Sequence, residues 1–123
     1  MRDLLVSAIC CTHNRPLFVR KAIELFKAQT WPRKELIIMD DGPEGSVPEI
    51  SDPEVRHVRI PSYTWITHKH RMAFPLCQGE LLAYWDDDDW YSPRRLALQA
   101  QAISEGRADV CGFHVKAIAS VPD

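Results

Sequence analysis

Apolar runs and helical periodicities alternate along this chain. Unbroken apolar stretches at residues 4–11, 35–39 and 81–85 predict buried strands, and the alternating pattern at 55–60 predicts a more exposed one. The apolar stretch at 109–118 predicts a last strand. Apolar positions spaced by three and four residues predict helices in the intervening segments. This order is typical of a three-layer α/β fold, a mostly parallel sheet with helices on both faces.

The predicted helices have recognisable boundaries. Asn14 is expected to cap a helix that ends before Trp31, and Thr67 to cap a second helix that reaches residue 77. Ser92, followed by Pro93 at the first helical position, is expected to begin a third helix that runs to residue 104. The sequence therefore predicts short turns between strands and helices.

Two of the predicted strands end in aspartates. Asp40 and Asp41 follow the strand at 35–39, and Asp86 to Asp89 follow the strand at 81–85. If the strands are parallel neighbours, both acidic ends lie on the same edge of the sheet and form one pocket. Asp86 and Asp88 point the same way if the strand geometry persists. Four adjacent carboxylates repel one another unless a cation offsets them, so we expect bound Mg²⁺ or Mn²⁺.

Other interpretations of these polar segments remain open. Acidic residues before a helix are also favoured by its macrodipole, although four in a row between Trp85 and Trp90 favour a metal site. The polar run at 67–71 suits phosphate binding and a solvated helix face equally well. His68 and His70 do not suggest zinc, because residues two apart point to different sides of a helix.

Composition narrows the class of protein. The 123 residues are 46% hydrophobic and 26% charged, which indicates one domain over residues 1–123 with a substantial core. The net charge of −2, with basic residues dispersed, disfavours nucleic-acid binding. No apolar run reaches the roughly 18 residues of a membrane span. With four cysteines that fit small buried hydrophobes, we expect a cytoplasmic protein, at most peripheral to a membrane.

Three segments carry a resemblance to a known family. VSAICCTHNRP, ELIIMDDG and GELLAYWDDDDWYSP, in this order, resemble the nucleotide-sugar-binding, amino-terminal half of a family 2 glycosyltransferase with the GT-A fold. The resemblance implies that Thr12 lines the nucleotide-base pocket and that Asp41 contacts the base or ribose. It also implies that Asp86 meets the ribose or a metal-bound water, and that Asp88 ligates the metal under the diphosphate. Arg71, where the family often shows an Arg-Asn pair, is the expected cation for the diphosphate.

The implied activity is transfer of a sugar from a nucleotide-diphosphate sugar, with a UDP-sugar favoured, to a carbohydrate or lipid-linked acceptor. Transfer is expected to be metal-dependent and inverting. In this family the acceptor site and the general-base carboxylate lie beyond the metal segment, so we expect a truncated domain without its base. His114 is the best internal substitute, although a histidine on an apolar strand is more often structural.

Two alternatives come from other functional classes. A non-catalytic nucleotide-sugar-binding module, or a subunit that completes its site with a second chain or another copy of itself, would keep Asp41, Asp86 and Asp88. A metal-dependent nucleotidyl- or phosphotransferase would use similar acidic strand ends. The absence of a glycine-rich phosphate loop from the sequence disfavours this last function.

Overall fold

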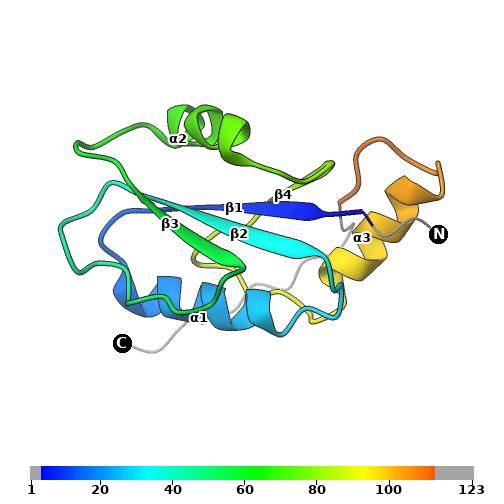
Figure 1. Ribbon diagram of the computed structural model, residues 1–123, viewed down its shortest axis with the longest axis horizontal. Helices are drawn as coiled ribbons and strands as arrows, with labels where there is room; N and C mark the ends of the chain where they lie inside the picture. Colours follow the sequence, from blue (N-terminus) through cyan, green and yellow to red (C-terminus); the bar gives the residue numbers. More distant parts are fainter. Residues whose placement is uncertain (1–3, 113–123) are drawn as a thin grey trace.

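A parallel sheet forms the centre of the molecule (Figure 1). The computed structural model describes residues 4–112. Within this range the strands are β1 (Val6–Thr12), β2 (Lys34–Asp40), β3 (Val55–Arg59) and β4 (Leu81–Tyr84). The helices are α1 (Pro16–Lys27), α2 (Ile66–Ala73), the short 3₁₀ helix η1 (Phe74–Leu76) and α3 (Arg95–Ser104). The strand order is β3-β2-β1-β4, and all three pairings are parallel.

Helices cover both faces of the sheet, as predicted. Successive side chains of β1 point to opposite faces, so Ala8 and Cys10 pack with Phe26 of α1 and Leu96 of α3. Ile9 points the other way, into a second cluster that contains Ala73 of α2. Figure 1 shows α2 on one side of the sheet and α1 on the other. The three-layer α/β class is confirmed, and none of the helices in residues 4–112 is long and apolar enough to cross a membrane.

The strand register aligns the chemically important ends. Thr12 lies opposite Asp40 in the β1–β2 pair, and Ile9 lies opposite Tyr84 in the β1–β4 pair. Because the strands are parallel, the residues that follow β1, β2 and β4 all leave the sheet at its carboxyl edge. The prediction that the two acidic strand ends share one edge is therefore confirmed.

The strand β4 differs from the expected buried strand. Leu82 and Tyr84 are 52% and 57% exposed, whereas Trp85 is fully buried. The reason is that β4 is the edge strand of the described sheet, with β1 as its partner. The predicted strand at 109–118 is not formed over residues 109–112, and its remainder lies outside the described residues.

The predicted helix caps are wrong in detail. Asn14 adopts a left-handed conformation, with φ of 49°, and α1 begins at Pro16 without a side-chain cap. Helix α2 begins at Ile66, so Thr67 lies inside its first turn. Helix α3 begins at Arg95, two residues later than predicted, because Pro93 and Arg94 form a turn in front of it.

Gln29, two residues beyond the end of α1, caps α3 instead. The side-chain oxygen of Gln29 accepts a hydrogen bond from the N–H of Leu96 (3.1 Å), and its amide nitrogen donates to the carbonyl oxygen of Ser92 (2.8 Å). An unpaired N–H of the first helical turn is therefore satisfied by a side chain from the segment that follows α1. This contact fixes α3 against the end of α1 and thereby anchors the segment that follows the acidic turn.

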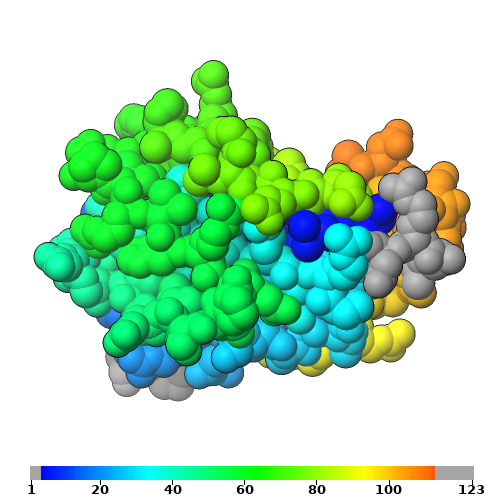
Figure 2. Space-filling view, in the orientation of Figure 1, coloured from blue at the N-terminus to red at the C-terminus, as the bar shows by residue number. Residues whose placement is uncertain are grey.

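A polar cluster at the amino edge of the sheet holds the connection into β4. The hydroxyl of Ser7 donates to Glu35 (2.5 Å) and accepts the N–H of Gly79 (2.8 Å), while the N–H of Gln78 donates to Glu35 (2.7 Å). In Figure 2 the yellow-green segment that leads into β4 lies directly against the blue and cyan starts of β1 and β2. These bonds satisfy buried polar groups and fix where β4 begins.

Gly79 therefore provides a test of this packing. A β-carbon at this position would lie 2.5 Å from the carbonyl oxygen of Leu5 and 2.9 Å from the nitrogen of Ser7, both backbone atoms. We expect Gly79→Ala to lower the free energy of unfolding by about 2 kcal/mol, measured by urea denaturation. Gly112→Ala, where no atom lies within 4 Å, is the matched control and should change stability by less than about 0.5 kcal/mol. Equal stability of the two variants would contradict the close approach.

Candidate functional site

A cavity of about 380 Å³ opens at the carboxyl edge of the sheet. Its walls come from the ends of β1 and β4, from the start of α2 and from the loop before α2. Polar and charged side chains of both signs line it. The lining residues are Cys11, Thr12, His13, Arg15, Tyr63, Thr64, Ile66, Lys69, Asp86, Asp87 and Asp88. A pocket is thus present at the predicted edge, but only the acidic end of β4 lines it, and Asp40 and Asp41 do not.

The four consecutive aspartates have different environments. Asp87 is buried and accepts hydrogen bonds from the hydroxyl of Thr12 (2.9 Å) and from Nη1 of Arg15 (3.0 Å). Asp88 is half-exposed, and its contact with Nη2 of Arg15 is longer, at 3.5 Å. Strand β4 ends at Tyr84, and residues 87 and 88 form a turn. The strand geometry that would have pointed Asp86 and Asp88 the same way therefore does not persist through the aspartates. Asp86 and Asp88 nevertheless both line the cavity.

An aromatic stack of Trp85 and Tyr91 packs against this acidic turn. Trp85 is fully buried and donates from its indole nitrogen to the carbonyl oxygen of Ala22 (3.0 Å). The ring of Tyr91 packs on Trp85 with centroids 4.2 Å apart, and the guanidinium of Arg95 lies 4.4 Å from the Tyr91 ring centroid. The Tyr91 hydroxyl also accepts the N–H of Asp86 (2.9 Å). The turn is therefore held by a rigid, largely apolar base.

The electrostatics of the turn favour a cation. Burial raises the pKa of Asp86, and the nearby charges of Asp89 and Asp88 raise it further. Burial also raises the pKa of Asp87, against the opposing effects of Thr12 and Arg15. Within residues 4–112 no three His, Cys, Asp or Glu side chains are grouped closely enough to hold a metal ion by themselves. One or two carboxylates with water and phosphate are sufficient for Mg²⁺.

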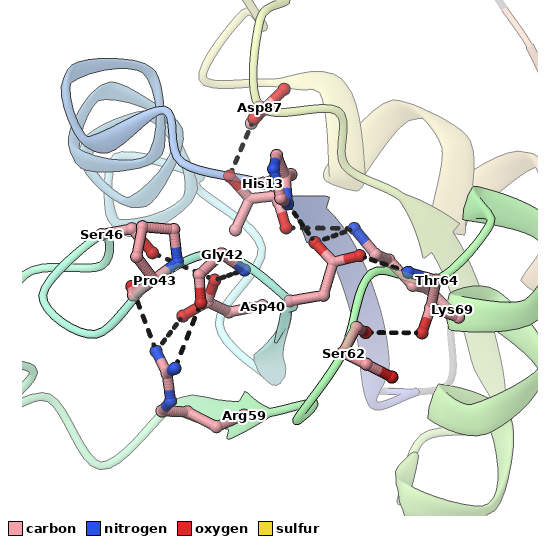
Figure 3. Close-up of polar contacts among 12 residues, drawn as sticks. His13, Asp40, Gly42, Pro43, Ser46, Arg59, Ser62, Thr64, Lys69 and Asp87 are labelled. Carbon is pink, nitrogen blue, oxygen red and sulfur yellow. Dashed lines mark hydrogen bonds and ion pairs between the residues drawn. The ribbon is translucent and has the colours of Figure 1, made fainter.

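Asp41 lies behind the cavity wall and does not line it. Its side chain is fully buried and accepts Nδ1 of His13 (2.8 Å), Nζ of Lys69 (2.8 Å) and the N–H of Thr64 (2.7 Å) (Figure 3). Burial acts to raise the pKa of this carboxyl, but the hydrogen bonds from Lys69, Thr64 and His13 outweigh it and lower the pKa below its usual value. The groups that face the cavity here are thus His13 and Lys69.

Asp40 shapes the loop beside the site and has no exposed surface. One of its oxygens accepts the N–H of Gly42 (2.8 Å) and the hydroxyl of Ser46 (3.1 Å), and the other contacts His57 (2.8 Å) and Arg59 (3.1 Å). Figure 3 shows Arg59 reaching from β3 to this loop. Asp40 is therefore a structural carboxylate that ties β3 to the turn after β2.

The predicted site residues are only partly brought together. Thr12, Asp86 and Asp88 line the cavity, whereas Asp41 lies beneath its wall. Arg71 is exposed on α2 and does not line the cavity. His114 lies outside the described residues.

Lys69, His13 and Arg15 are basic cavity residues to which the sequence assigned no individual role. Lys69 is only 4% exposed, and its amine also donates to the carbonyl oxygen of Thr12 (3.1 Å). Residues two apart lie on different sides of a helix, so Lys69 and Arg71 could not both face the cavity, but the sequence did not indicate which of them does. His13 and Arg15 belong to the segment after β1 that carried the resemblance.

Comparisons with known proteins agree with this architecture. The family model described as glycosyl transferase family 2 matches residues 7–122. Protein CgeD of Bacillus subtilis (strain 168) is 29% identical over 111 residues, which cover 80% of this chain and 26% of CgeD.

Solved structures share the fold. A mannosyltransferase of Pyrobaculum calidifontis, PcManGT, in complex with GDP-Man and Mn²⁺, superposes with a TM-score of 0.66 at 19% identity, covering 81% of this chain and 31% of that one. S. aureus TarS in complex with UDP gives a TM-score of 0.70 at 15% identity, covering 94% and 38%. The fold is therefore that of the GT-A glycosyltransferases, and the chain spans about a quarter to two fifths of the length of these proteins.

The buried pair of Lys69 and Asp41 makes a stability prediction. Lys69→Met keeps the apolar stem but leaves the Asp41 carboxylate without its ammonium partner in a buried position. We expect the free energy of unfolding at pH 7 to fall by about 3 kcal/mol, because breaking a buried pair from one side leaves an uncompensated charge.

The matched control is Lys21→Met, which removes an exposed lysine paired with an exposed glutamate and should cost less than about 1 kcal/mol. Because the pKa of Asp41 is lowered in the folded state, its contribution to stability is fully present above the unfolded pKa of about 4 and is lost as the pH falls from there through the lowered folded pKa. The difference between wild type and Lys69→Met should shrink in acid. An undiminished difference at pH 3 would contradict the assignment.

Proposed function

Because this chain belongs to glycosyl transferase family 2, we propose that its cavity binds the nucleotide-diphosphate part of an activated sugar. The observation that carries this proposal is the distribution of charge in one cavity. Asp86 and Asp88 supply carboxylates, while Lys69 and Arg15 supply cations. A metal–diphosphate complex is a ligand that needs both kinds of group.

The donor atoms at the turn fit a hard divalent cation. Asp86 and Asp88 line the cavity with carboxylate oxygens, which Mg²⁺ and Mn²⁺ prefer, and Asp88 is half-exposed. The similar mannosyltransferase was solved with Mn²⁺, which supports the same class of ion here. We assign Asp88 as the principal ligand and Asp86 as the ligand of the metal, of a bound water or of the ribose. Such an ion would offset the charge of the diphosphate leaving group.

The nucleoside is proposed to lie against the opposite wall. His13 and Tyr63 pack edge to face, with ring centroids 5.4 Å apart, and both line the cavity. Their faces and edges can pack against a nucleobase. Thr12 also lines the cavity. Asp41 acts in this arrangement by holding His13 and Lys69. The GDP-Man complex of PcManGT and the UDP complex of TarS support a nucleoside diphosphate as the ligand.

Sugar transfer is proposed for the whole protein. The donor is a nucleotide-diphosphate sugar, with UDP-sugars favoured, and the acceptor is a carbohydrate or a lipid-linked carbohydrate. Inverting transfer needs a general base near the acceptor hydroxyl, and Asp87 is unsuited to that role because both of its oxygens already accept hydrogen bonds. Lys69 and Arg15 take the role of diphosphate cation that was expected of Arg71, which is exposed on α2 and does not line the cavity.

The first test of this function is metal-dependent binding of UDP. In the presence of Mn²⁺, UDP at a hundredfold excess over its Kd should stabilise the protein by about 2.7 kcal/mol, visible as a rise in Tm. UDP in excess EDTA should give much less stabilisation, because the diphosphate would then meet uncompensated carboxylates. Equal stabilisation with and without EDTA would disprove metal dependence.

The second test is Asp88→Asn. This change keeps the size of the side chain but removes one charge from a crowded turn, so the ligand-free protein should be as stable as wild type or slightly more stable. Affinity for UDP measured in Mn²⁺ by calorimetry should fall at least about tenfold, or 1.4 kcal/mol. Asp109→Asn, at an exposed position away from this cavity, is the matched control. Unchanged UDP affinity in Asp88→Asn would show that the acidic turn has a structural role and does not bind the metal.

A further inference from the structure

The guanidinium of Arg15 lies against the acidic turn. It donates from Nη1 to Asp87 (3.0 Å) and from Nη2 to Asp88 (3.5 Å), and its central carbon lies 4.6 Å from the centroid of the Phe18 ring. The side chain is 41% exposed and lines the cavity together with both aspartates. Arg15 thus contacts two of the four carboxylates and also faces the space where a ligand would bind.

The two contacts of Arg15 differ in kind. Asp87 is 6% exposed, and one of its oxygens accepts the hydroxyl of Thr12 while the other accepts Arg15. That contact is short and its carboxylate is buried, so removing the cation would leave a buried charge with one donor fewer. The contact with Asp88 is at the outer limit of a hydrogen bond and half-exposed, so water and other cations compete with it readily.

We propose that Arg15 is the resident counter-cation of the acidic turn and exchanges partners when the donor binds. Before binding, Arg15 offsets the charges of Asp87 and Asp88. It keeps Asp87 throughout, yields Asp88 to the divalent ion that arrives with the nucleotide, and turns Nη2 to an oxygen of the diphosphate. Guanidinium groups bind phosphate oxygens well, and no covalent step is involved. This inference rests on the proposed function.

The exchange has a consequence that a purely structural arginine would not have. Arg15 repels a metal ion that approaches Asp88 alone, but it attracts the diphosphate that accompanies the metal. Removing its charge should therefore strengthen the binding of metal alone and weaken the binding of UDP in the presence of metal. If Arg15 only held the turn in shape, its loss would weaken both.

The experiment compares wild type with Arg15→Gln. Mn²⁺ alone, titrated by electron paramagnetic resonance, should bind the variant about threefold more tightly, since one nearby positive charge is gone. UDP, titrated by calorimetry in saturating Mn²⁺, should bind it about tenfold more weakly, since one cation for the diphosphate is lost. Neither measurement depends on catalytic activity.

Two further variants separate charge from shape. Arg20→Gln removes an exposed arginine from α1, the helix that begins directly after Arg15, and should change neither affinity. Arg15→Lys keeps the charge but loses the fork that reaches two carboxylates, so Mn²⁺ affinity should stay near wild type while UDP affinity falls by an intermediate amount. Tm values of all variants show whether each one folds, and Arg15→Lys provides the test if Arg15→Gln does not.

The outcomes are distinguishable. Opposite changes in Mn²⁺ and UDP affinity support the exchange. Loss of both affinities, or no change in either, overturns it while leaving the proposed function in place. A wild-type protein that binds neither Mn²⁺ nor UDP would overturn the proposed function, and this inference with it.

Discussion

Carboxylates crowd the carboxyl edge of this sheet, and the arrangement of the surrounding elements depends on supplying them with donors. Asp40 and Asp41 are fully buried at their side chains, where an unpaired charge would cost several kcal/mol. Asp40 is satisfied from β3 and from its own loop, and Asp41 from α2 and from the turn after β1. Helix α2, strand β3 and the β1–α1 turn are therefore connected through these two side chains, and their positions cannot change independently.

The four aspartates after β4 extend this arrangement and leave part of it open. Asp87 is enclosed by two donors, whereas Asp86 and Asp88 face the cavity. The stack of Trp85 and Tyr91 holds the turn in place, so the aspartates cannot move apart and reduce their mutual repulsion. Repulsion that is retained in this way is a source of cation affinity, since a bound cation relieves it. The structure thus encloses the carboxylates of Asp40, Asp41 and Asp87 with donors, while Asp86 and Asp88 face the cavity.

The fold explains why one cavity can serve a bulky, charged ligand. Parallel strands bring the ends of β1 and β4 to one edge of the sheet. Helix α2, which packs on the face that carries Ile9, forms another wall of the cavity. The GT-A structures that resemble this chain share that architecture and are considerably longer. The exposed apolar side chains Leu82 and Tyr84 lie on β4, the edge strand of the described sheet, away from the cavity.

The sequence by itself determined the order of strands and helices, the layered fold and the meeting of two acidic strand ends, because hydrophobic periodicity and the parallel rule are local or topological properties. Asp86 and Asp88 could be placed at the cavity for the same reason, whereas Thr12 was expected there only from the resemblance of its segment to the family. Tertiary structure alone decided that Lys69 rather than Arg71 faces inward, since the rotation of α2 about its axis follows from packing on the sheet. It also decided that Gln29 caps α3, and that Asp41 is enclosed by donors 23 and 28 residues away in the chain. Such pairs depend on burial and on distance in space, and no local pattern of residues encodes them.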